Sequence, residues 1–163
     1  MPRLAAAALC ATLSACGFQL RGEAPADLRS IHVTTAANSA VAVAIRRQLS
    51  GGPMRLAAEP GQARARIHIL AENTEKSIQT LTSAGRVFDY VLRLRVDFEA
   101  ADAAGHPLVE RSGIEVRRII TYSETAPLAK EVEERQLFDD MRDEAAARIL
   151  RRVAVAKEGA LPR

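Results

Sequence analysis

Residues 86–99 read RVFDYVLRLRVDFE and contain the most regular hydrophobic alternation in the chain. Its even positions are all apolar: Phe88, Tyr90, Leu92, Leu94, Val96 and Phe98. The odd positions from Asp89 onward are charged, except for Val91. A period of two places successive side chains on opposite faces, so the segment predicts a long strand with one buried and one solvated face. Complete burial of the apolar side chains is worth roughly 9–18 kcal/mol as an upper estimate, which makes this strand the centre of the expected core.

Three other segments also alternate and predict strands on both sides of this one. They are residues 29–35, residues 64–72 with a continuation towards Thr80, and residues 108–122. Turn sequences at residues 82–85 and 102–107 join the last two segments to the central strand, which predicts a three-stranded meander. We expect a bulge or bend at Ser112 and Gly113, and at residues 54–62 either a plain loop or a loop that includes a short extended piece.

Two amphipathic helices are expected, one in each half of the chain. The first begins after an N-cap at Asn38 or Ser39 and ends at a Gly-Gly-Pro sequence, residues 51–53. The second has Pro127 in its first turn. Its apolar residues recur at spacings of three and four and form one stripe: Phe138, Met141, Ala145, Ile149 and Val153.

The order β-α-β-β-β-α predicts an α/β two-layer sandwich, in which both helices pack on one face of a four-stranded mixed sheet. We expect one domain over residues 28–156 and a flexible tail at residues 157–163. The other face of the sheet is expected to be solvated and rich in arginine. Cross-strand pairing with Asp and Glu is one interpretation of these arginines, and contact with an anionic partner is the other: Arg64, Arg66, Arg93, Arg95 and Arg117.

The amino terminus predicts a lipoprotein. Residues 1–15 begin with a basic residue, continue with an apolar Ala-rich stretch and end in Leu13-Ser14-Ala15, directly before Cys16. This resembles the lipobox of bacterial lipoproteins, in which the cysteine thiol receives diacylglycerol after the signal peptide is removed. Residues 16–27 are then a lipidated tether. Gly17 follows the cysteine where such lipoproteins carry aspartate for retention in the inner membrane, so the resemblance implies the outer membrane.

Composition and motif searches argue against several functions. The chain has 163 residues, a formal net charge of +3, 4% aromatic residues and no Trp, so aromatic platforms for single-stranded nucleic acid are scarce. The histidines His32, His68 and His106 have no metal-ligand spacing. Cys10 lies in the predicted signal and Cys16 is consumed by lipid. We therefore expect no enzyme activity, no metal and no cofactor apart from the covalent lipid.

Three motifs in chain order are similar to the LptE family of lipopolysaccharide-assembly lipoproteins. They are CGFQLRG at residues 16–22, Phe88-Asp89-Tyr90 in the central strand, and Leu128-Ala129-Lys130-Glu131 at the start of the last helix. The resemblance implies a non-enzymatic partner of the LptD barrel that lodges in the barrel lumen, helps it assemble and binds lipopolysaccharide. The protein would then sit at the periplasmic side of the outer membrane, with its lipid in the inner leaflet.

The resemblance also implies which residues contact lipopolysaccharide. Lys130 matches the family's lysine in the Leu-Ala-Lys motif. The family also has an arginine in the turn before the central strand; here Ser83 stands near that place, and Arg86 is the candidate substitute. Arg93, Arg95 and Arg117 are expected on the surface that faces the barrel. The alternative is a free periplasmic lipid carrier that holds an acyl chain in its own cavity.

Overall fold

The computed structural model describes residues 30–51, 54–123 and 125–160. The predicted signal peptide and tether lie outside these residues. The elements in chain order are β1 (Ser30–Thr35), α2 (Ala40–Gly51), β2 (Arg55–Leu56), the 3-10 turn η2 (Pro60–Gln62), β3 (Ala65–Leu81), β4 (Val87–Asp102), β5 (Pro107–Thr121) and α3 (Pro127–Ala160). In the part of the chain that these ranges cover, no helix is long and apolar enough to cross a membrane.

The predicted α/β sandwich is confirmed, but the sheet has five strands in the order β2-β1-β3-β4-β5. β1 runs parallel to β2 and β3, whereas β3, β4 and β5 form the antiparallel meander. The additional strand is β2, which has only two residues and pairs Arg55 with Ser30 and Leu56 with Ile31. A two-residue strand has no sequence period, so the sequence predicted a loop at residues 54–62, with a short extended piece as an alternative, and no fifth strand.

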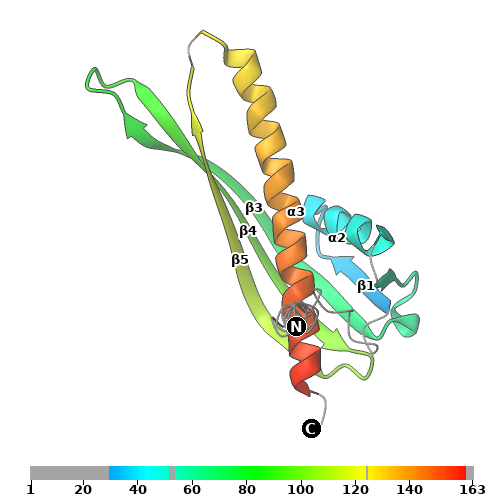
Figure 1. The fold of residues 1–163 in the computed structure, drawn as a ribbon. Helices are drawn as coiled ribbons and strands as arrows, with labels where there is room; N and C mark the ends of the chain where they lie inside the picture. Colours follow the sequence, from blue (N-terminus) through cyan, green and yellow to red (C-terminus); the bar gives the residue numbers. More distant parts are fainter. Residues whose placement is uncertain (1–29, 52–53, 124, 161–163) are drawn as a thin grey trace, which may run out of the picture.

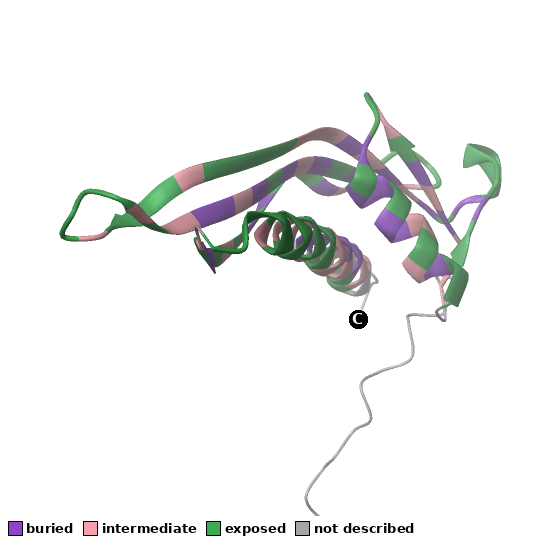
Figure 2. Cartoon of the chain, turned by 90° about the horizontal axis from the view of Figure 1, so that it is seen from above, coloured by how far each residue is buried: buried purple, intermediate pink, exposed green. Residues whose placement is uncertain are grey.

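Both helices cover the same face of the sheet, and Figure 2 shows this arrangement from above. The core between the layers contains Leu92, Leu94, Val96 and Phe98 of β4, all completely buried. The predicted stripe of α3 supplies Met141, Ala145, Ile149 and Val153, which are also completely buried, and α2 supplies Val41, Ala44, Ile45 and Leu49. The interior is thus filled by packed apolar side chains, which does not favour the alternative of a lipid carrier.

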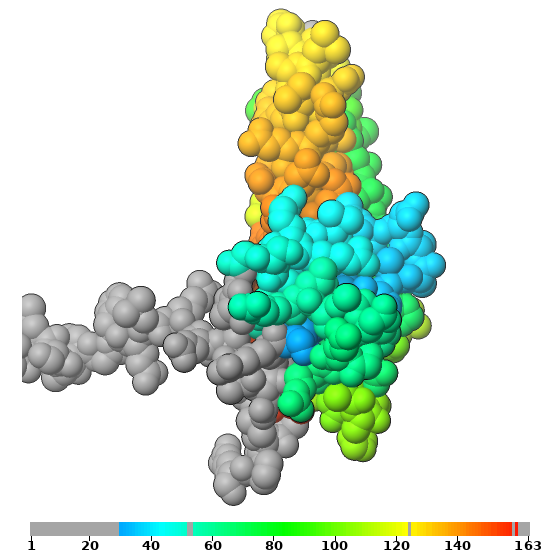
Figure 3. Space-filling view, turned by 90° about the vertical axis from the view of Figure 1, so that its right-hand side faces the viewer, coloured from blue at the N-terminus to red at the C-terminus, as the bar shows by residue number. Residues whose placement is uncertain are grey.

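The ends of the central strand differ from the prediction. Phe88 is 49% exposed, and Val91, on the opposite face, is 3% exposed. The long meander and the first half of α3 extend beyond α2, so α2 does not cover the sheet at this end (Figures 1 and 3). Alternation predicts which way Phe88 points, but the distance to a covering element decides whether the side chain is buried. We call the region of the β3–β4 turn and the first turn of α3 the distal end.

β3 changes its facing direction at Leu70. Ile69 pairs with Phe98 and Ala71 with Asp97, so the ladder skips Leu70, which forms a bulge. Before the bulge Ala65, Ile67 and Ile69 face the helices; after it, Glu72 and Lys76 lie beside the buried Val96 and Leu92 and therefore face the same way. A register shift also lies between the pairs Phe98–Ser112 and Ala100–Val109, immediately before the bend predicted at Ser112 and Gly113.

The bulge places Glu72 at the N-terminus of α2. The Oε2 atom of Glu72 accepts hydrogen bonds from Ser39 Oγ at 2.7 Å and from the Val41 backbone N–H at 3.0 Å. Ser39 Oγ in turn accepts the Ala42 N–H at 3.0 Å, so Ser39 is the N-cap. The side chain of Arg142 from α3 approaches the other oxygen of Glu72, with 3.5 Å between Nε and Oε1. This cluster joins the sheet to both helices.

α3 begins at Pro127 as predicted but continues to Ala160, and thus includes Lys157 and Gly159 of the predicted tail. Residues 161–163 lie outside the described residues. All acidic residues of α3 except Glu158 lie between Glu131 and Glu144, whereas residues 145–157 contain only basic charges: Arg148, Arg151, Arg152 and Lys157. Positive charge near the C-terminus of a helix is favoured by the helix dipole.

Candidate functional site at the distal end

The β3–β4 turn is a tight loop that places Arg86 at the tip of the meander. Thr82 donates its backbone N–H to the Arg86 carbonyl at 2.7 Å, and its hydroxyl accepts the Arg86 N–H at 3.1 Å. Gly85 has φ +74°, a left-handed conformation that costs little only for glycine. Arg86 is exposed, in agreement with its predicted place before the central strand.

Lys130 lies in the first turn of α3. Its backbone N–H donates to the Ala126 carbonyl at 3.2 Å, which is the first hydrogen bond of the helix. Its side chain is 28% exposed and its Nζ is 2.8 Å from Oε2 of Glu133, one turn later. A cation at this end of a helix is disfavoured by the dipole, and the ion pair with Glu133 offsets that cost.

Lys130 lines a cleft between the first turns of α3 and the helix-facing side of the sheet. The cleft has a volume of about 180 Å³. The sheet contributes Lys76, Tyr90, Ile120, Thr121 and Tyr122, and α3 contributes Pro127, Lys130, Glu131 and Glu134. We call it the lysine cleft. Arg86 belongs to the turn beyond it and is not part of this lining.

Lys76 is the second cation of the lysine cleft, and two partners fix its position. Its Nζ forms an ion pair with Glu134 of α3 and lies 4.5 Å from the centroid of the Tyr90 ring, a cation–π distance. Tyr90 meets Tyr122 edge-to-face, with ring centroids 5.9 Å apart. Both lysines therefore have carboxylate partners on α3, and an anionic ligand has to displace Glu133 or Glu134 to reach them.

Exposed apolar side chains surround this charged cleft. Leu128 is 75% exposed and Val132 is 54% exposed, one turn apart on α3. The meander adds Phe88 at 49% and Ile78 at 57%, on the same face of the sheet as Tyr90. The distal end thus combines two ammonium groups with accessible apolar surface, which suits a ligand that has both phosphates and acyl chains. Exposed apolar side chains gathered in one region commonly mark a binding surface.

The arginines predicted to face a partner lie on the other side of the sheet, away from the helices. Each is in an ion pair on its own face of the sheet: Arg93 with Glu75 at 3.3 Å, Arg95 with Asp97 at 3.3 Å, and Arg117 with Glu115 at 3.9 Å. Arg66 donates to the Asp102 carbonyl at 3.2 Å. This surface is polar with alternating charges, so the pairing interpretation describes it better than a basic patch.

Sequence reasoning located Lys130 and Arg86 but missed Lys76, Tyr90 as its ring partner, and Tyr122. The bulge at Leu70 turns Lys76 towards α3, and uninterrupted alternation from Ile69 would place it on the other face. The sequence does contain a signal for this bulge. The apolar residues of β3 have odd numbers up to Ile69, whereas Ile78 has an even number. Among the residues in the described ranges, no group of His, Cys, Asp and Glu is arranged to hold a metal ion.

A model of the LptE family, described as lipopolysaccharide-assembly, matches residues 28–153. The chain belongs to the LptE family. This family consists of non-enzymatic lipoproteins that act in lipopolysaccharide assembly. A search of curated proteins gave no match.

Solved structures agree with this assignment of the LptE-family chain. It is similar to an uncharacterized lipoprotein B from Nitrosomonas europaea, with 30% identity, a TM-score of 0.74, and coverage of 88% of this chain and 94% of that one. The fold is also that of the rare lipoprotein B from Shewanella oneidensis, with 22% identity, a TM-score of 0.69, and coverage of 80% and 97%. A minor lipoprotein from Acinetobacter baumannii gives 17% identity, a TM-score of 0.64, and coverage of 80% and 93%.

Proposed function

We propose that this protein is an outer-membrane lipoprotein that plugs the LptD barrel, helps it assemble, and binds lipopolysaccharide during insertion into the outer leaflet. The lipid on Cys16 holds it in the inner leaflet, and the folded domain occupies the barrel lumen from the periplasmic side. The observation that carries the proposal is the lysine cleft, because it places Lys130, the residue implied by the family motif, in an amphipathic surface.

The lysine cleft fits the chemistry of lipopolysaccharide. The phosphates of lipid A or the core form charge-assisted hydrogen bonds with Lys130 and Lys76, in place of their ion pairs with Glu133 and Glu134. Phe88, Leu128 and Val132 offer apolar contact to acyl chains. Because the ligand competes with existing ion pairs, the net gain is modest, which suits a protein that passes its ligand on. Arg86 extends the positive charge to the tip of the meander.

The body of the protein fits the lumen of a large barrel. The interior of such a barrel is polar, so a plug needs a rigid shape with a polar outer surface. The open face of the sheet meets this need through the pairs that Arg93, Arg95 and Arg117 form with acidic side chains. These arginines are proposed to face the barrel wall as part of a mixed polar surface.

Co-purification tests the partnership with LptD. The full chain carries a C-terminal tag, is extracted in a mild nonionic detergent, and is isolated by affinity and size-exclusion chromatography. We expect it to elute with the large barrel protein. Elution of the lipoprotein alone refutes the proposed plug. Labelling with a radioactive fatty acid, compared with Cys16→Ser, tests the lipid anchor independently.

Lys130→Glu tests the lipopolysaccharide contact. We expect binding to purified lipopolysaccharide to weaken about tenfold or more, because a charge-assisted hydrogen bond to an anion contributes roughly 1.5–3 kcal/mol. The matched control is Arg55→Glu, which makes the same change of charge on the exposed β2. Circular dichroism should give the same spectrum for all three proteins. Equal affinity for Lys130→Glu and the control removes Lys130 from the site.

A further inference from the structure

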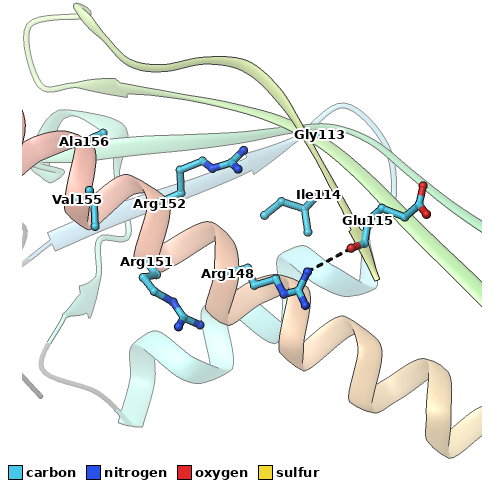
Figure 4. A pocket seen from close by; sticks show the side chains of 8 residues that line it. All are labelled: Gly113, Ile114, Glu115, Arg148, Arg151, Arg152, Val155 and Ala156. Atoms are coloured by element: carbon cyan, nitrogen blue, oxygen red, sulfur yellow. Dashed lines mark hydrogen bonds between the residues drawn. The ribbon is translucent and has the colours of Figure 1, made fainter. Parts of the chain in front are cut away.

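A second groove lies between β5 and the last third of α3, at the opposite end of the helix from the lysine cleft. It has a volume of about 650 Å³. Figure 4 shows its lining: Gly113, Ile114 and Glu115 from β5, and Arg148, Arg151, Arg152, Val155 and Ala156 from α3. We call it the arginine groove. At about 1.5 Å per residue, Lys130 and Arg152 are roughly 33 Å apart along the helix, so one small ligand cannot fill both sites.

Arg148 is held in place by the protein itself. Its Nη1 donates to the Glu115 backbone carbonyl at 3.2 Å, across the groove (Figure 4). Its Nη2 forms an ion pair with Glu144, one turn earlier on α3, and the other oxygen of Glu144 binds Arg118 of β5. The hydrogen bond from Arg118 outweighs the effect of burial and, with the charges of Arg118 and Arg148, lowers the pKa of Glu144. Glu144 therefore stays ionised and keeps Arg148 at the groove.

Arg151 and Arg152 differ from Arg148. Over residues 30–51, 54–123 and 125–160, neither guanidinium has a hydrogen bond or an ion pair, and both side chains are exposed. Arg152 extends towards Gly113, whereas Arg151 lies on the outer side of the helix (Figure 4). The nearest acidic residues of α3 in the sequence are Glu144, seven residues before Arg151, and Glu158, six residues after Arg152, so neither arginine has a carboxylate three or four residues away on the helix. Three guanidinium groups within two turns repel one another unless an anion joins them.

The rest of the lining is apolar. Ile114 is 7% exposed and lies between the guanidinium groups of Arg148 and Arg152 (Figure 4). Val155, which is 62% exposed, and Ala156 add apolar side chains farther along α3 (Figure 4). The groove therefore suits an amphiphilic anion, with a phosphate for the guanidinium forks and a hydrocarbon segment for Ile114 and Val155. An acidic peptide would use the arginines but would leave the apolar lining without a partner.

We propose that the arginine groove binds the phosphate of an anionic phospholipid headgroup. Guanidinium groups bind phosphate through paired N–H donors, and several together suit a phosphodiester at a membrane surface. The choice of a phospholipid rests on the proposed anchor at Cys16. Ser30 is the fourteenth residue after Cys16, so the connecting chain spans roughly 50 Å when fully extended and roughly 20 Å as a flexible coil. The start of β1 and the end of α3 both lie in the half of the molecule opposite the β3–β4 turn (Figure 1).

Calorimetric titration of the full chain in a nonionic detergent tests this proposal. The ligands are dihexanoyl phosphatidylglycerol, its zwitterionic phosphatidylcholine counterpart, and glycerol phosphate, which has the phosphate without acyl chains. We expect phosphatidylglycerol to bind in a saturable way and more tightly than either of the others. The double variant Arg151→Ala/Arg152→Ala should weaken this binding about tenfold. This factor corresponds to the loss of about one guanidinium–phosphate contact. Arg55→Ala/Arg64→Ala removes the same charge outside the groove and should change little.

Two results overturn the proposal: equal binding of phosphatidylglycerol and phosphatidylcholine, or equal affinity of the groove variant and its control. If phosphatidylglycerol does not bind but Arg151→Ala/Arg152→Ala abolishes co-purification with the barrel, the occupant is an acidic protein surface and the proposal is wrong. Lipopolysaccharide binding should be unchanged in the groove variant, and phosphatidylglycerol binding should be unchanged in Lys130→Glu. The proposals for the lysine cleft and for the arginine groove can therefore be refuted independently of each other.

Discussion

Replacement of Glu72 should cost this domain much more stability than replacement of any exposed carboxylate. Its side chain is 11% exposed and accepts hydrogen bonds from Ser39 Oγ at 2.7 Å and from the Val41 N–H at 3.0 Å. Arg142 Nε lies 3.5 Å from its second oxygen and is buried without a hydrogen-bond partner among the described residues. Glu72→Ala therefore removes a helix cap and leaves Arg142 with only its ion pair to Asp139, at 2.7 Å, among the contacts of the described residues.

The size of the loss follows from these contacts. Hydrogen bonds to a charged acceptor contribute roughly 1.5–3 kcal/mol each, so the two bonds together give about 3–6 kcal/mol. Ser39 still caps the Ala42 N–H at 3.0 Å, and the groove beside Glu72 lets water reach part of the cluster. We therefore expect about 3 kcal/mol for Glu72→Ala. Glu72→Gln keeps an oxygen for both donors and loses the charge, so about 1 kcal/mol is expected.

Equilibrium urea unfolding of the full chain, followed by circular dichroism, measures these changes. The control is Glu75→Ala, three residues along the same strand, because the Glu75 side chain is 59% exposed and pairs with Arg93 on the surface. An exposed ion pair contributes about 0–1 kcal/mol. In a chain of this size, a loss of 3 kcal/mol lowers the melting temperature by roughly 6–12 °C. Similar losses for Glu72→Ala and Glu75→Ala would refute this account of the cluster.

Three other changes test separate parts of the structure. The pKa of Glu144 is lowered from 4.5 by the hydrogen bond from Arg118 and by nearby positive charges, so its stabilisation is complete above pH 4.5 and is lost as the pH falls through the lower folded-state value. In Glu144→Gln, the midpoint of urea unfolding should therefore fall less steeply as the pH is lowered into the acid range. The same pH dependence in the variant and the wild type would contradict this prediction. Gly85→Ala should lower the free energy of unfolding by about 1 kcal/mol, because an alanine side chain is strained at φ +74°. An unaltered melting temperature would show that alanine is not strained at this position. Met141→Ala should cost about 2–5 kcal/mol in thermal unfolding because the side chain is completely buried, and a loss below 1 kcal/mol places it outside the core.

The central strand could be predicted because its alternation holds from Leu92 to Phe98, where the helices cover the sheet. The same pattern continues to Phe88, and there the prediction of burial is wrong because α2 does not cover the sheet at that end. Local sequence encodes the direction of a side chain, whereas burial depends on elements far away in the chain. The stripe of α3 was predicted well for the same reason, since its buried positions face the middle of the sheet.

The lysine cleft was predictable only in part. Lys130 could be located through a motif that stands at the start of a helix, where a local signal and the fold agree. Lys76 depends on a one-residue bulge at Leu70, which no glycine or proline marks and which reverses the facing of the residues from Ala71 to Ile78, where the next register shift begins. Without this bulge, uninterrupted alternation from Ile69 would place Lys76 on the face of the sheet opposite to Tyr90. The two-residue strand β2 was missed because pairing with β1, rather than a pattern of its own, defines it.

The charge distribution along α3 differs between the two proposed ligand sites. Around Lys130 the helix is acidic, so the lysine is neutralised by Glu133 and a ligand must displace an existing partner. Around Arg151 and Arg152 the helix carries only positive charge, and a ligand meets guanidinium groups that are already free of carboxylates in the described structure. The first arrangement favours exchange and release, as a site that passes lipopolysaccharide onward requires. The second favours retention, as a contact with the membrane that holds the protein requires.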